Sequence, residues 1–115
     1  MNLSKFLAAM MLSLPLSVFA IGAIAVDDEA GDEEPGYGFV AGYDNKDEAR
    51  RDALKECKKS GNENCKIVAW FETCGAYAVS KKYYGAGWGS TKQKAEAMAL
   101  EKCGGKCRVA VSECE

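Results

Sequence analysis

An internal repeat is the feature that most constrains the fold of this 115-residue chain. Residues 22–26 (GAIAV) recur as residues 75–79 (GAYAV), and in each copy an aromatic, glycine-containing segment follows, at 37–42 and 84–89. Each copy then continues with an alanine-containing stretch, a glycine-containing turn and a short segment that begins at a cysteine. Self-similarity of this kind indicates that each copy is one supersecondary unit.

The alanine-containing stretches, 44–58 and 90–103, have the pattern of amphipathic helices. Asp44 and Ser90 are candidate N-caps, because their side-chain oxygens can accept a hydrogen bond from the first helical turn. Small and apolar residues recur one turn apart, which predicts a buried stripe on each helix. These residues are Ala49, Ala53, Leu54 and Cys57 in the first helix and Ala95, Ala99, Leu100 and Cys103 in the second.

The segments around the helices are short, rich in aromatic and β-branched residues, and bounded by glycines, as expected of strands. The predicted fold class is therefore α+β, with two tandem ββαβ repeats over 21–73 and 74–115. We expect a mainly antiparallel sheet with two helices on one face, stapled by disulfides. In the first unit, residues 27–36 contain six acids and are predicted to form a mobile hairpin loop. The equivalent loop of the second unit is short and basic.

All six cysteines lie after residue 56, and an even number in a short chain favours a disulfide framework. A zinc site is the alternative, but the sequence has no histidine and no C-x2-C spacing. Each helix ends in a cysteine, and another cysteine begins the following strand. The repeat therefore predicts the pairs Cys57–Cys65 and Cys103–Cys107. This leaves Cys74–Cys114, which we expect to join the two units.

The N-terminal residues 1–20 have the features of a cleaved secretory signal peptide. Lys5 precedes an apolar stretch at 6–18 that is shorter than the roughly 20 residues a spanning helix needs. Cleavage after Ala20 would leave a single domain at 21–115, with no membrane span; cleavage after Ala25 and a retained anchor helix are the alternatives. The predicted location is the periplasm or the exterior, where disulfides persist.

The motifs together resemble a bacterial domain-of-unknown-function family, number 4189. The resemblance covers nearly all of the chain after the signal peptide. It implies a small secreted or periplasmic protein and brings no active site and no cofactor. The segments that carry it are 22–26, 48–57, 65–71, 74–79, 85–89 and 95–107.

The sequence favours a protein that is not an enzyme. Without histidine, the usual acid–base group at neutral pH is missing, as are the Ser-His and Cys-His nucleophile systems. A pair of carboxylates remains the alternative, since sugar hydrolysis needs only two. We predict no catalytic residue, no metal and no cofactor. The net charge of −2 gives no indication of nucleic-acid binding.

Aromatic residues are the better indication of a functional surface. If both helices cover one side of the sheet, the other side stays open. We expect Trp70, Tyr77, Tyr84 and Trp88 to contribute to an aromatic binding patch on that side, with Lys81 and Lys82 beside it. The alternative is that these aromatic side chains form a second small core, because small domains seldom expose several large rings.

The function predicted from these observations is a non-catalytic exported module that binds another protein, such as a toxin or an envelope enzyme. Two alternatives stay open: a small carboxylate-dependent enzyme acting on an envelope polymer, and a structural or stress-related envelope component without a specific ligand. The sequence identifies neither the partner nor the oligomeric state.

Overall fold

The computed structural model describes residues 21–29, 31 and 33–114; the predicted signal peptide, residues 1–20, and its cleavage site lie outside the described part. The chain forms strand, strand, helix and strand twice in succession, which confirms the two tandem ββαβ units. The elements of the first unit are β1 (Ile21–Asp27), β2 (Gly36–Tyr43), α2 (Lys46–Lys59) and β3 (Lys66–Phe71). Those of the second are β4 (Cys74–Val79), β5 (Tyr84–Gly89), α3 (Lys92–Cys103) and β6 (Arg108–Cys114).

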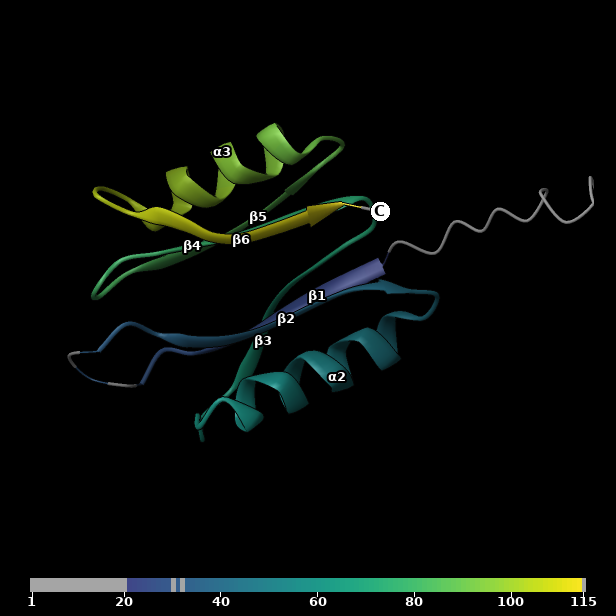
Figure 1. The fold of residues 1–115 in the computed structure, drawn as a ribbon, viewed down its shortest axis with the longest axis horizontal. Coiled ribbons are helices and arrows are strands. Elements are labelled where there is room, and N and C mark those ends of the chain that lie inside the picture. The colour runs from purple at the N-terminus through teal and green to yellow at the C-terminus, as the bar shows by residue number, and fades with distance from the viewer. Residues whose placement is uncertain (1–20, 30, 32, 115) are drawn as a thin grey trace, which may run out of the picture.

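The α+β class and the antiparallel pairing are as predicted, but the strands are divided between two sheets rather than joined in one. Their strand orders are β2-β1-β3 and β5-β4-β6, all pairs antiparallel. The two sheets stack face to face, and each helix covers the outer face of its own sheet (Figure 1). The helices therefore lie on opposite sides of the molecule. The physical reason is that β1 and β4 are apolar on both faces, so each needs a cover on both.

The core between the sheets accounts for most of the large buried side chains. It consists of Ile24, Val26, Ala69, Phe71, Tyr77, Val79 and Ala86. Tyr37 of the first sheet and Tyr77 of the second have ring centroids 4.6 Å apart, and within the first sheet the Phe39 and Phe71 rings are 5.5 Å apart over β1. Of the four rings that the alternative assigned to a second core, Tyr77 alone is fully buried here, Tyr84 packs partly against it, and Trp70 and Trp88 are exposed.

Small residues allow each helix to lie very close to its sheet. Ala49, Ala53 and Cys57 of α2 and their equivalents in α3 are buried against alanines of β1 and β4. A side chain at Gly85 of β5 would place its Cβ 2.3 Å from the carbonyl oxygen of Ala99. The helices begin one residue later than predicted, because Asn45 and Thr91 are the N-caps in place of Asp44 and Ser90.

All six cysteines are paired, in the three combinations that the repeat predicts: Cys57–Cys65, Cys103–Cys107 and Cys74–Cys114. The first two close equivalent helix–turn–strand corners. We expected the third to join the two units, but it does not. Cys74 is the first residue of β4, which pairs with β6, so it lies directly opposite Cys114 within the second unit.

The acidic loop between β1 and β2 is anchored at its first residues. Asp27 is almost fully buried, and its carboxylate accepts hydrogen bonds from the backbone N–H groups of Glu29, Glu63 and Asn64, at 2.9–3.2 Å. These hydrogen bonds lower the pKa of Asp27, since they stabilise the ionised form. Asp27 thus connects the loop to the turn that follows α2.

The last residues of the same loop contact the second unit. The Glu34 carboxylate accepts two hydrogen bonds from the Arg108 guanidinium, at 2.7 and 3.1 Å, which lowers the pKa of Glu34. The buried Tyr77 hydroxyl donates to the Pro35 carbonyl oxygen at 3.2 Å. We predicted a mobile hairpin loop, whereas the described residues at both of its ends are fixed by hydrogen bonds. The loop links the two units.

Candidate functional site

The structure separates the predicted patch residues into three groups. Trp70 and Trp88 are 40% and 41% exposed, and Tyr84 is half-buried. Tyr77 is fully buried between the sheets, so it does not belong to a surface patch. The reason is the second sheet, which covers the face that we expected to be open. Lys81 and Lys82 are exposed in the β4–β5 turn and do not line the groove described next.

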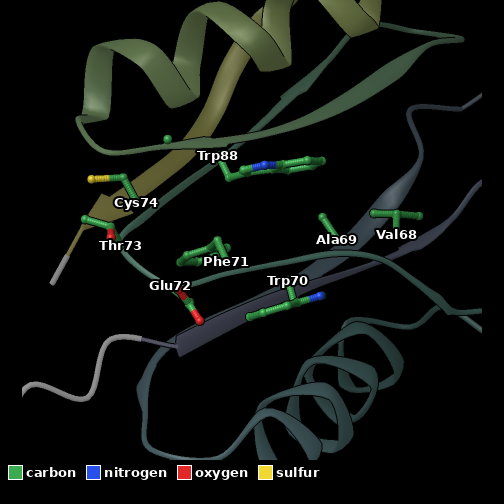
Figure 2. A pocket seen from close by; sticks show the side chains of 9 residues that line it. Val68, Ala69, Trp70, Phe71, Glu72, Thr73, Cys74 and Trp88 are labelled. Atoms are coloured by element: carbon green, nitrogen blue, oxygen red, sulfur yellow. The ribbon is translucent and has the colours of Figure 1, made fainter.

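Trp70 and Trp88 are brought together at one edge of the stacked sheets, where β3 and β5 are the outer strands. A groove of about 490 Å³ runs along this edge (Figure 2). We call it the edge groove. Its lining residues are Val68, Ala69, Trp70, Phe71, Glu72, Thr73, Cys74, Trp88 and Gly89. Six of these are consecutive residues of β3 and of the β3–β4 linker, so the groove follows the chain.

Strand alternation fixes the direction of the Trp88 side chain. Gly85 and Gly87 face α3, because a Cβ on either would collide with the backbone of that helix. Trp88 and Ala86 therefore face the other way, toward the first sheet. Figure 2 shows the Trp88 ring lying over β3, on the same side of that strand as Phe71.

Trp70 takes the opposite direction, so the prediction that it shares the helix-free side of the sheet with Trp88 is wrong. Its neighbours Ala69 and Phe71 both point into the core between the sheets, so Trp70 points toward α2. Figure 2 shows Trp70 and Trp88 on opposite sides of β3. The outer edge of β3 thus runs between two tryptophan rings, one on each face of the strand.

A lysine lies on each of these rings. The Nζ atom of Lys46, at the start of α2, is 4.2 Å from the Trp70 ring centroid, and that of Lys102, near the end of α3, is 4.8 Å from the Trp88 centroid. Such cation–π contacts contribute about 0.5–1 kcal/mol at exposed sites. They also hold two positive charges at the borders of an apolar groove.

A second hollow continues the edge on the other side of Trp88. Lys66, Ile67, Val68, Tyr84, Ala86 and Lys102 line it together with Trp88. Tyr84, one of the predicted patch residues, therefore belongs to this part of the site. Its hydroxyl donates to the Asp28 carboxylate at 3.4 Å, and Lys66 forms an ion pair with the same carboxylate at 3.1 Å. Burial, followed by the nearby Asp28 charge, raises the pKa of Tyr84, so its hydroxyl stays protonated at neutral pH.

The internal repeat provides a comparison, because the edge formed by β2 and β6 is equivalent to the edge formed by β3 and β5. Ala23 lies opposite Trp70, and its equivalent Ala76 lies opposite Ser112, so Ser112 takes the place of Trp70. The aligned segments 37–42 and 84–89 put Ala41 in the place of Trp88. The β3–β5 edge therefore has two tryptophans, and the equivalent β2–β6 edge has neither.

The two edges also differ in charge. The hollow at the β2–β6 edge is lined by three glutamates, Glu34, Glu56 and Glu113. The β3–β5 edge carries Lys46, Lys66 and Lys102. Lys66 is paired with Asp28, and Glu34 and Glu56 are paired with Arg108 and Lys59, so the two edges differ in their balance of charge, which is more basic at β3–β5.

Comparison with known proteins agrees with the fold. The model of the family described as "Domain of unknown function (DUF4189)" matches residues 21–114. The chain belongs to this family. The NMR structure of Rv1813c from Mycobacterium tuberculosis is similar to this DUF4189 domain, with a TM-score of 0.66 and 29% sequence identity over 89% of this chain and 81% of that chain. No curated protein matches it.

The side chains that line the edge groove of this DUF4189 domain are mostly apolar. Glu72 is the one ionisable side chain that lines it, whereas sugar hydrolysis uses two carboxylates on either side of the bond. Residues 21–29, 31 and 33–114 contain no cluster of three or more side chains suited to hold a metal. In the same residues, no helix has the length and apolar character that a membrane span requires.

Sequence reasoning identified Trp70, Tyr84 and Trp88 but missed Lys46, Lys102 and Phe71. Phe71 could have been found, because it precedes the β3–β4 linker and alternates with Trp70. The two lysines could not. Each is separated from its tryptophan by 14 or more residues, and only the packing of the helices brings them together.

Proposed function

We propose that this domain is a non-catalytic, exported binding module that engages another protein through the edge groove. The observation that carries the proposal is the difference between the two equivalent edges. Ala41 and Ser112 occupy the positions equivalent to Trp88 and Trp70 in the other repeat. Folding alone therefore does not require tryptophan at positions 88 and 70. Two large, partly exposed aromatic side chains on one edge therefore favour a role in recognition.

The composition of the groove supports protein binding in particular. Tryptophan is enriched among the residues that contribute most to binding at protein interfaces, and such residues lie in apolar centres with polar rims. Here Trp88 and Phe71 form an apolar centre, while Lys46, Lys102 and Glu72 stand at its borders. Truncating an aromatic residue of this kind commonly costs 2 kcal/mol or more in affinity.

The disulfides and the N-terminal sequence support export. Three bridges in a short domain are typical of proteins that fold in an oxidising compartment, such as the periplasm or the exterior. Residues 1–20 have the sequence features of a cleaved signal peptide. The mature protein would then begin at Ile21, the first residue of β1.

Affinity capture from the envelope and culture fluid of the producing cells tests the proposal. The oxidised domain serves as bait in three forms: wild type, Trp88→Ala, and Tyr83→Ala as the control. Tyr83 is 60% exposed and lies outside the groove, so Tyr83→Ala also removes an aromatic ring from the surface but leaves the groove unchanged. We expect a partner that wild type and Tyr83→Ala retain and that Trp88→Ala loses, with circular dichroism confirming that all three are folded.

Two results would contradict the proposal. Retention of the same partner by Trp88→Ala would place the interface elsewhere on the domain. Repeated capture experiments that return no partner with any bait would favour the structural role over the binding role.

A further inference from the structure

We infer that the edge groove receives an extended, acidic segment of the partner, which pairs with the free edge of β3 between Trp88 and Trp70. The inference rests on the proposed function, since it specifies the chemistry of the partner at the same groove. It follows from three properties of β3: its place in the sheet, the tryptophans on its two faces, and the charges around it.

β3 is an outer strand. Within the described residues it pairs with β1 on one side and has no strand on the other. An edge of this kind presents unpaired backbone N–H and C=O groups, and an extended peptide can satisfy them by adding a strand. The groove follows residues 68–73, and six extended residues span about 20 Å at roughly 3.3 Å per residue. The groove therefore suits a segment of about six residues.

The tryptophans define which side chains such a segment needs. Successive side chains of a strand point to opposite faces. In a strand added beside β3, one set would meet Trp88 and Phe71, and the other set would meet Trp70. The segment should therefore carry two large apolar residues at positions such as i and i+1 or i and i+3, so that one falls on each face.

The charges specify acidic residues around these apolar ones. Lys46 and Lys102 lie on the two tryptophan rings, and neither forms an ion pair with residues 21–29, 31 or 33–114. An acidic segment would meet a positive charge on each side of β3. The groove itself has one acidic side chain, Glu72, against these two lysines. At the equivalent β2–β6 edge Glu34 and Glu56 are paired with Arg108 and Lys59 and Glu113 is acidic, so the balance of charge favours the β3–β5 edge for an acidic segment.

Selection from a phage-displayed library of random ten-residue peptides tests the inference. The oxidised wild-type domain is the target, and Trp88→Ala removes peptides that bind elsewhere. We expect the selected peptides to be net negative, to lack proline in the centre, and to share two large apolar residues at odd spacing. Selected peptides that are neutral or basic, or that show no such spacing, would overturn the inference.

Charge reversal on a selected peptide tests the electrostatic part. The double variant Lys46→Glu/Lys102→Glu should bind at least tenfold more weakly at low salt, about 0.7 kcal/mol for each exposed charge pair. The control variant Lys81→Glu/Lys82→Glu changes the same charge in the β4–β5 turn, away from the groove, and should keep the wild-type affinity within about twofold. An equal loss in both variants would show that the net charge of the domain, and not the two lysines at the groove, determines the affinity for the peptide. That result would overturn the electrostatic part of the inference.

Amide hydrogen exchange with the same peptide separates strand pairing from simple insertion into the groove. Protection should increase in the complex at those amides of residues 69–71 that point away from β1, which belong to alternate residues of the strand. A peptide that requires Trp88 but leaves these amides unprotected would refute strand pairing while keeping the proposed function. Binding of glycan chains, or concentration-dependent self-association, that is lost in Trp88→Ala would assign the groove to another occupant and overturn the inference.

Discussion

Gly85 of β5 tests the close contact between helix and sheet that both units share. A methyl group at this position would lie 2.3 Å from the Ala99 carbonyl oxygen and 2.4 Å from the Cys103 backbone nitrogen. Carbon atoms in proteins approach other heavy atoms to about 3.5 Å, so α3 would have to move by roughly 1 Å. Both obstructing atoms belong to the helix backbone, and Cys103 is also tied to Cys107, so no side chain can rotate away.

The cost of Gly85→Ala follows from this geometry. Overpacking a core costs about 1–3 kcal/mol, and a clash with backbone places this variant at the upper end. The smaller conformational entropy of alanine in the unfolded chain offsets about 0.4–1 kcal/mol. We expect a net loss of about 2 kcal/mol in the free energy of unfolding. For a domain of this size, this corresponds to a decrease of roughly 8–16 °C in Tm.

Thermal unfolding followed by circular dichroism measures the effect, and Gly105→Ala is the matched control. Gly105 lies in the turn between α3 and β6, where an added Cβ has no atom within 4 Å. Gly38→Ala should resemble Gly85→Ala, because its Cβ would lie 2.2 Å from the Ala53 carbonyl oxygen of the other unit. If Gly85→Ala and Gly105→Ala melt within 2 °C of each other, the reasoning from close contact is refuted.

Two further predictions concern pH and the disulfides. The lowered pKa of Asp27 means that its contribution to stability is present above about pH 4 and is lost as the pH falls toward its folded-state pKa. Melting curves between pH 7 and pH 2 should therefore show a steeper acid-side loss for wild type than for Asp27→Asn; parallel curves would contradict this. Loop-closure entropy assigns about 4 kcal/mol to Cys74–Cys114, which are 40 residues apart, and about 2 kcal/mol to Cys103–Cys107, which are 4 apart. Urea unfolding of the two double-alanine variants should rank them in this order, and the reverse order would argue against chain entropy as the main source of stability.

Much of the fold could be predicted because the chain contains two copies of one unit, which can be aligned with each other. The repeat fixed the order of the elements, and the cysteines that end each helix indicated their partners at the start of the next strand. The number of sheets could not be obtained in this way. Strand alternation shows which residues share a face, but it does not show what covers that face. The continuous apolar runs of β1 and β4 were the available signal, because strands buried on both faces have this composition.

The candidate site was predictable only in part, for a related reason. Trp70 and Trp88 were identified by residue type, and Tyr77 was grouped with them because the same strand pattern applies to all three. Whether a ring is exposed depends on its position across the sheet. Tyr77 is on the central strand β4 and is covered by the first sheet, whereas Trp70 and Trp88 are on the outer strands. Lateral strand order is a tertiary property that no local pattern reports.

The shared core between the two sheets has a consequence for how the domain is assembled. Each unit keeps its helix on one face but depends on the other unit to cover the opposite one, where Ile24, Phe71 and Tyr77 lie. Residues 21–73 alone would expose an apolar sheet face to water. That face is shaped to accept a unit of the same architecture, so two such half-chains are suited to pair with each other. The present chain is then equivalent to a covalently joined dimer of half-domains. Each half contributes one tryptophan, Trp70 or Trp88, to the β3–β5 edge and one small residue, Ser112 or Ala41, to the β2–β6 edge, so the joined chain can have two different edges where a symmetric pair would have two identical ones.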